Sequence, residues 1–174
     1  MRLSVALFAI CLLSSLQPQL MAQEVELQTF TTQQRWDRAA RHVALGPVSG
    51  MAYAKSMGQS VEDYANAMAD LFVPGWGEAG VGRLSVVRSL YLNFASYPNC
   101  EFEIVDQSDT AITVRRNRPW SVFFGDDYLW YGVTIQEFET WYEIFDIRLA
   151  EHLGMGVEEW DQDGWRYIKF TLGG

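Results

Sequence analysis

The residues most suggestive of chemistry are three glycines at positions 75, 77 and 80, which have the spacing G-x-G-x-x-G. In dinucleotide-binding folds, such glycines let the backbone approach a pyrophosphate at the N-terminus of a helix. A helical pattern follows at residues 84–94, and Glu103 or Asp106 would be the acid that binds the ribose. The motif therefore raises the hypothesis of a nicotinamide-dependent dehydrogenase.

The neighbouring residues argue against this hypothesis. Residues 60–72 have helical periodicity after an N-cap serine, so a helix and not a strand precedes the glycines. Pro74 and Trp76 stand within the turn, where the indole ring would obstruct the approach to a pyrophosphate. After Asp106 the pattern predicts hairpins and no further βαβ unit, which leaves no parallel sheet for the nucleotide. We therefore predict a loop between two helices and no cofactor.

Other polar groups have the residue types of metal or hydrolase sites. Residues 161–164 have the D-x-D-G order of a calcium loop, but a phenylalanine replaces its essential glutamate, so we interpret them as a turn. Asp126 and Asp127 are adjacent carboxylates in a turn, where consecutive side chains diverge. His42 and His152 lie on helices without a recognisable nucleophile motif. We predict no metal site and assign no catalytic residue.

The strongest compositional signal is aromatic, with six rings between positions 120 and 131 and others up to position 167. Strand alternation cannot bury every ring, and tryptophan and tyrosine keep a polar atom for a ligand. The basic run R-R-N-R at 115–118 lies just upstream, and aromatic walls with an arginine suit a small hydrophobic or aromatic acid. The alternative is an aromatic-rich core with surface ion pairs. The predicted ligand-binding residues are Arg116, Arg118, Trp120, Tyr131 and Trp141.

The elements that would position these residues change in period after Pro98, from helical stripes to alternating strands. Before it we predict helices over residues 31–57, broken or kinked at Gly46-Pro47, and over 60–72 and 84–94. After it we predict a hairpin over 101–116 with Glu101 opposite Arg115, a strand at 122–124 returning at 128–131, a helix over 135–153, and a hairpin over 157–172. The fold class is α+β, with N-terminal helices, an antiparallel sheet of hairpins and a long amphipathic helix packed on the sheet.

In order of elements, residues 84–172 resemble two families, the vinyl-reductase-like ligand domains and the aminothiazoline-carboxylate hydrolase-like proteins. The resemblance rests on a helix, the hairpin over 101–116, the amphipathic helix over 135–153 and a terminal strand. It implies an α+β domain that binds or hydrolyses a small molecule. Those families place cysteines in the later half, whereas Cys100 precedes the hairpin, so no site residue is inferred from the resemblance.

The first 22 residues predict export. A positive start at Arg2, an uncharged apolar run and a small residue at Ala22 are typical of a cleaved signal peptide. We predict a single domain over residues 23–174, periplasmic or secreted, with no stable membrane span after cleavage. The whole chain has 22 acidic against 13 basic residues, and this negative charge disfavours nucleic-acid partners.

The predicted function is binding of a small hydrophobic or aromatic acid between the long helix and the sheet. One alternative is a small hydrolase that uses His42 or the pair Asp126 and Asp127 in the same cavity. Another is a protein-interaction module without a cavity, whose exposed rings meet a partner.

Overall fold

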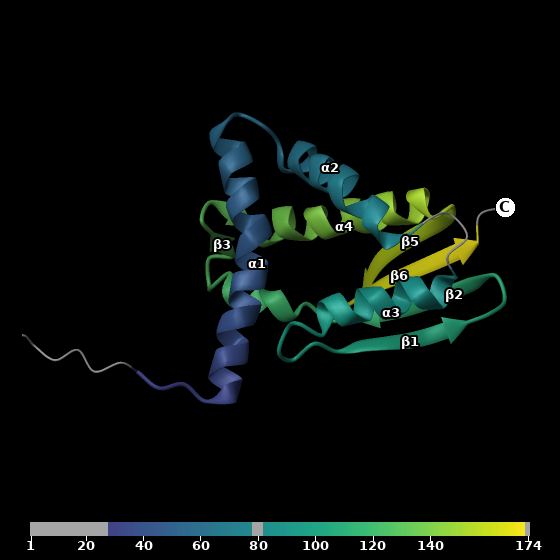
Figure 1. Ribbon diagram of the computed structural model, residues 1–174, viewed down its shortest axis with the longest axis horizontal. Helices are drawn as coiled ribbons and strands as arrows, with labels where there is room; N and C mark the ends of the chain where they lie inside the picture. The colour runs from purple at the N-terminus through teal and green to yellow at the C-terminus, as the bar shows by residue number, and fades with distance from the viewer. Residues whose placement is uncertain (1–27, 78–81, 173–174) are drawn as a thin grey trace, which may run out of the picture. The chain divides into compact units, whose positions relative to one another are not determined.

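Figure 1 shows the computed structural model of the chain, which describes residues 28–77 and 82–172. The chain divides into residues 1–30 and residues 31–174, and every element described below belongs to the second unit. The predicted signal peptide at residues 1–22 lies outside the described residues. Helices combine with an antiparallel sheet, and this confirms the α+β class.

Among the described residues, three α-helices precede the first strand: α1 (Thr32–Ser56), α2 (Val61–Phe72) and α3 (Arg83–Phe94). The first two begin with capping boxes. The side chain of Thr31 accepts a hydrogen bond from the backbone of Gln34, and that of Ser60 accepts one from the backbone of Asp63. Each box satisfies two backbone N–H groups that a helix start would otherwise leave unpaired, which is why both helices begin where the sequence predicts.

Of the predicted break or kink at Gly46-Pro47, the break is wrong, because α1 runs through Pro47 without interruption. Proline has no N–H, so the carbonyl oxygen of Val43 lacks its usual helical donor. Gly46 has no Cβ to clash with the proline ring, which makes the helical conformation tolerable before Pro47. Buried residues on both sides of the proline in the sequence, including Ala44 and Val48, anchor α1 in the core.

Gly50 allows α1 and α2 to approach closely. A Cβ at this position would overlap the hydroxyl and ring of Tyr64 on α2. Because Gly50 has no side chain, the Tyr64 ring can lie directly against α1.

We expect Gly50→Ala to lower the free energy of unfolding by about 1–3 kcal/mol, because the added methyl group forces the Tyr64 ring to move. In a Tyr64→Leu background the same substitution should be neutral or stabilising by up to about 1 kcal/mol, since alanine favours a helix over glycine. Urea unfolding of the four proteins measures this coupling. Equal effects of Gly50→Ala in both backgrounds would contradict the proposed contact.

The glycine-rich segment connects two helices. It follows α2 and begins with the short 3₁₀ helix η1 (Val73–Trp76), before α3. The Nε2 atom of His152 lies 2.7 Å from the carbonyl oxygen of Gly77. Residues 78–81, which complete the glycine motif, lie outside the described residues. The predicted helix before the glycines is confirmed, so the strand-to-helix turn of a dinucleotide fold is not formed here.

Four antiparallel strands form the main sheet in the order β1-β2-β6-β5: β1 (Phe102–Gln107), β2 (Ala111–Arg116), β5 (Met155–Gln162) and β6 (Trp165–Leu172). Both predicted hairpins are confirmed, and β2 pairs with β6 to join them. The predicted register of the first hairpin is wrong, because Glu103 and not Glu101 faces Arg115. The turn closes between Ser108 and Ala111, and a bulge after Ile104 shifts the pairing by one residue along the hairpin.

The predicted strand at residues 122–124 is also wrong. This segment belongs to the 3₁₀ helix η2 (Pro119–Phe123), and the next two strands are only β3 (Leu129–Trp130) and β4 (Val133–Thr134). Trp120 and Phe124 are both fully buried while Val122 is 73% exposed, which is the spacing of a helical turn and not of a strand. Pro119 at the start of η2 supplies a φ angle suited to a helix.

The long helix α4 (Ile135–His152) packs on the sheet next to β5, as predicted, and it also contacts α2. In Figure 1, α3 runs along the sheet near β1 and β2, and α4 lies toward β5 and β6. The main sheet turns the buried side chains of Ile112, Val114, Ile168 and Phe170 into the core. The opposite face of the sheet carries Trp160 and Tyr167, whose rings stack on each other. One face of the sheet is therefore covered by helices.

Among the described residues, no helix combines the length and the apolar character needed to cross a bilayer.

Candidate functional site

A cavity of about 650 Å³ lies among the four α-helices. Protein interiors contain few voids larger than a water molecule, so an opening of this size is a distinct feature of the fold. The exposed residues Asn93 and Ser96 are among those that border it. The lining residues that carry the argument below are Met68, Trp76, Trp141, Tyr142, Phe145 and Asp146.

The aromatic wall of the cavity comes mainly from α4. Trp141 and Phe145 are four residues apart and therefore lie on one side of the helix, with their ring centroids 6.1 Å apart. Trp76 from η1 meets Phe145 edge to face at 5.9 Å. The Trp141 Nε1 atom is buried and has no hydrogen-bond partner among the described residues.

A pair of tyrosine hydroxyls joins α4 to the segment after α3. The hydroxyl oxygens of Tyr97 and Tyr142 lie 3.0 Å apart, and both residues border the cavity. Burial and the neighbouring Tyr97 raise the pKa of the Tyr142 hydroxyl well above its usual range. Trp120 stacks on the Tyr142 ring at 4.6 Å, which holds the ring in place. The pair is therefore a neutral, fixed polar element at the edge of an apolar wall.

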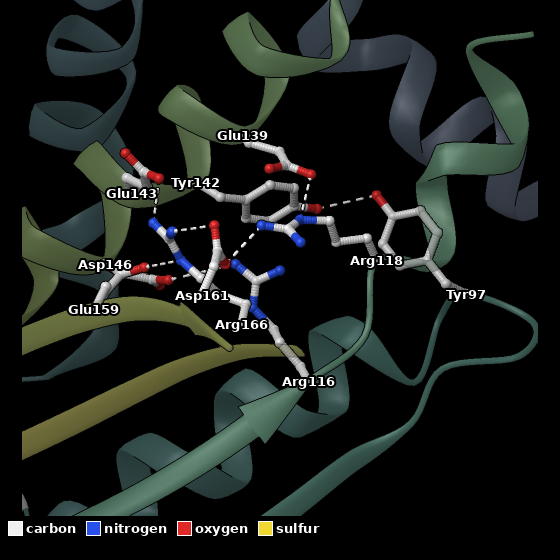
Figure 2. Close-up of polar contacts among 10 residues, drawn as sticks. All are labelled: Tyr97, Arg116, Arg118, Glu139, Tyr142, Glu143, Asp146, Glu159, Asp161 and Arg166. Atoms are coloured by element: carbon white, nitrogen blue, oxygen red, sulfur yellow. Dashed lines mark hydrogen bonds and ion pairs between the residues drawn. The ribbon is translucent and has the colours of Figure 1, made fainter. Parts of the chain in front are cut away.

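Figure 2 shows an ionic cluster between α4 and the sheet. Arg118 contacts Glu139 at 2.6 Å and Asp161 at 2.7 Å. Arg166 contacts Glu159 at 2.9 Å and also pairs with Glu143 and Asp161. Three arginines face five carboxyl groups, so full ionisation would leave a surplus of two negative charges. We call the eight residues Arg116, Arg118, Glu139, Glu143, Asp146, Glu159, Asp161 and Arg166 the ionic cluster.

Asp146 belongs to the ionic cluster and is also among the residues that line the cavity. Its side chain is 1% exposed, and its nearest cation is Arg116 at 4.0 Å, beyond hydrogen-bond distance. Neither carboxyl oxygen has a hydrogen-bond partner among the described residues. Burial and the carboxylate of Glu159 raise the pKa of Asp146 to about 8, against the opposing effect of Arg116.

Arg116 is held mainly by aromatic faces. Its guanidinium carbon lies 4.4 Å from the ring centroid of Phe94 and 4.8 Å from that of Trp120. These contacts are cation–π interactions. Burial lowers the pKa of the guanidinium, while the nearby Asp146 opposes that shift. Arg116 is therefore a core residue whose charge is balanced inside the protein.

The five residues predicted to bind a ligand lie in three places. Arg116, Arg118 and Trp120 are brought together beside α4, where the crevice that they help to form has essentially no internal volume. Trp141 lines the cavity. Tyr131 is 69% exposed in the turn between β3 and β4. The cavity thus lies among the helices and not at the predicted position between the long helix and the sheet.

Sequence reasoning missed Asp146 and the part of the cavity wall that comes from the N-terminal helices. Asp146 lies four residues after Tyr142 and three before the buried Leu149. A carboxyl group at that spacing falls within the apolar stripe of α4, and this signal in the sequence would have predicted a buried acid. No comparable signal marks the wall residues of α1 and α2, because their positions depend on how the helices cross.

The residues considered for hydrolysis are not assembled into a site in the part of the chain that the structure describes. His42 is exposed on α1, and Asp126 and Asp127 are exposed in the turn after η2. Cys100 is half-buried, and burial raises the pKa of its thiol, which lowers its reactivity. Within the described ranges, no group of three or more His, Cys, Asp or Glu residues is arranged so that it could hold a metal ion.

No protein-family model, curated protein or solved structure matches this chain. The resemblance in order of elements therefore stays a prediction, and the functional argument rests on the geometry of the cavity and the ionic cluster.

Proposed function

We propose that the chain binds a small hydrophobic, ring-containing molecule in the cavity among its four α-helices. The observation that carries this proposal is the size of the cavity, about 650 Å³, together with its largely apolar wall. Sites for small organic molecules typically have volumes of about 300–1,000 Å³ and a few polar groups among apolar ones. The hydroxyl pair of Tyr97 and Tyr142 supplies such polar groups.

The chemistry of the wall narrows the ligand class. The rings of Trp76, Trp141 and Phe145 favour a flat, apolar molecule that can stack or lie edge to face. The sequence predicted an acid held by Arg116 or Arg118, but no arginine is among the residues found to line the cavity. We therefore retain the ring-containing ligand and drop the acid from the proposal.

Filling the cavity should abolish retention of the ligand. We expect Met68→Trp, which adds an indole at the wall, to weaken binding of a ring compound by about tenfold or more. Native mass spectrometry of protein purified from its own exported fraction measures the retained molecule, and quenching of tryptophan fluorescence by added ring compounds measures affinity. A ligand-sized mass on the wild-type protein and its loss in the variant support the proposal.

The matched control is Leu71→Trp, which adds the same ring at a 73% exposed position of the same helix. This control should bind like the wild type. If both variants bind equally well, the molecule occupies another place. If the wild-type protein carries no ligand and its fluorescence ignores ring compounds, the proposed function fails.

We also propose that the protein works outside the cytoplasm, after removal of residues 1–22. The same mass spectrum tests this point, because a cleaved chain begins at Gln23. The mass of the complete 174-residue chain in the exported fraction would contradict cleavage.

A further inference from the structure

The surface formed by α1 and the neighbouring residues 125–132 has the features of a contact between two copies of the chain. We propose that the protein forms a two-fold symmetric homodimer, in which residues 125–132 of each copy pack against the N-terminal half of α1 of the other. We call residues 125–132 the tyrosine loop. This inference goes beyond the proposed function, since none of these residues is among those found to line the cavity.

The tyrosine loop combines exposed rings with a strained backbone. Tyr128 and Tyr131 are 60% and 69% exposed, and Leu129 between them is also exposed. Both tyrosines have positive φ angles, 53° and 51°, a left-handed conformation that suits glycine and that bulky residues rarely adopt. In a single chain, neither burial of the ring nor ease of the backbone accounts for tyrosine at these positions. Backbone strain is often retained at functional sites, and tyrosine is enriched at protein interfaces, so the loop is suited to contact a partner.

Charges of opposite sign lie on the two neighbouring parts of this surface. Asp126 and Asp127 are exposed in the tyrosine loop, and Arg35 and Arg41 are exposed on α1. None of the four forms an ion pair within the part of the chain that the structure describes. The guanidinium carbon of Arg41 lies 5.4 Å from the ring centroid of Trp130, and α1 contacts β4, so the loop lies beside α1 (Figure 1).

A surface with an acidic part beside a basic part is complementary to a second copy of itself. In a two-fold dimer the same surface of both copies meets, so the loop of each copy faces the helix of the other. Each contact between opposite charges is then made twice, and the exposed rings are buried between the copies. The chain has a formal net charge of −9, so two copies repel each other unless opposite charges are brought together. The arrangement of charge therefore favours this one mode of association.

Charge reversal on each part of the surface tests the dimer. Sedimentation equilibrium of the wild type at about 10–100 μM should give a mass approaching twice that of one chain. The double variant Asp126→Arg/Asp127→Arg sets arginine against arginine, and Arg35→Glu/Arg41→Glu sets glutamate against aspartate, so each alone should be monomeric. An equal mixture of the two should form dimers again, because a mixed pair has opposite charges at both contacts. A monomeric wild type, a variant that still dimerises alone, or a mixture that stays monomeric overturns the inference.

The matched control is Glu101→Arg/Asp106→Arg, which changes the net charge by the same amount at exposed positions at and near β1. This control should dimerise like the wild type. If it is monomeric, net charge and not the proposed contact governs association, and the inference fails.

Tyr131→Gly separates a role in the contact from a role in folding. Glycine adopts the positive φ angle of this position without strain, so the melting temperature of the dilute, monomeric protein should stay the same or rise. The loss of the exposed ring should weaken dimerisation by about tenfold or more. Unchanged dimerisation would show that the ring is not part of the contact and would overturn the assignment. The mass of the wild type decides whether the dimer exists even if a variant does not fold.

Discussion

Arg116→Met is expected to lower the free energy of unfolding by about 1–2 kcal/mol at about pH 9, because the buried carboxyl group of Asp146 loses its nearest cation and must take up a proton in the folded state. Arg116 lies 4.0 Å from Asp146, and both side chains are almost fully buried. Methionine fills most of the space of the aliphatic stem, so the loss comes from the charge and not from an empty volume. Urea unfolding monitored by tryptophan fluorescence measures the effect.

Two further variants distinguish a charge effect from a packing effect. Arg116→Met combined with Asp146→Leu should recover most of the loss, because an apolar pair of similar volume often replaces a buried ion pair without cost. Arg118→Met removes a cation that is about one quarter exposed and should cost only about 1 kcal/mol or less. A loss that persists in the double variant would show that Arg116 acts through packing on Phe94 and Trp120.

The fold class could be predicted from the sequence because the patterns that indicate its helices and hairpins involve only neighbouring residues. The side chains of Thr31, Ser60 and Thr134 each cap a helix with a residue three positions later, and these starts are confirmed. The two long hairpins follow from alternation around a polar turn. Such patterns need only a few neighbouring residues, so they are readable without knowledge of the tertiary structure.

The errors occur where tertiary packing decides. The helix around Pro47 continues because buried residues before and after the proline anchor the same helix. The segment after Pro119 contains residues that suit a strand, but Trp120 and Phe124 are buried together one helical turn apart. The register of the first hairpin depends on the bulge after Ile104, which the alternation does not reveal. None of these features has a local signal as strong as a capping box.

The candidate site was predictable only in part, because composition does not say which rings contact one another. Trp120 has a large apolar side chain, but it packs against Phe138 and Tyr142 in the core and does not line the cavity. Trp141 borders the cavity together with side chains from α2 and η1, which contact α4. The basic run correctly indicated an unusual concentration of charge, and carboxyl groups from β1, β5 and α4 pair with its arginines.

The buried carboxyl group of Asp146 should make the protein less stable as the pH rises between about 4 and about 8, by up to about 1.4 kcal/mol per pH unit. Burial and Glu159 raise the pKa of Asp146 from 3.8 in the unfolded chain to about 8 in the folded protein. Between these values the folded state holds a proton that the unfolded state has released. Raising the pH therefore favours unfolding. The loss of stability continues until the pH reaches the pKa of Asp146 in the folded protein.

The measurement is the difference in free energy of unfolding between the wild type and Asp146→Asn over this pH range. Titrations far from Asp146 cancel in the difference, which leaves Asp146 and the charged groups that face it from α4 and the sheet: Glu143, Glu159, Arg116 and Arg166. The two proteins should be similar near pH 5, and the variant should be the more stable by several kilocalories per mole near pH 8. A difference that does not change with pH would mean that Asp146 is ionised throughout.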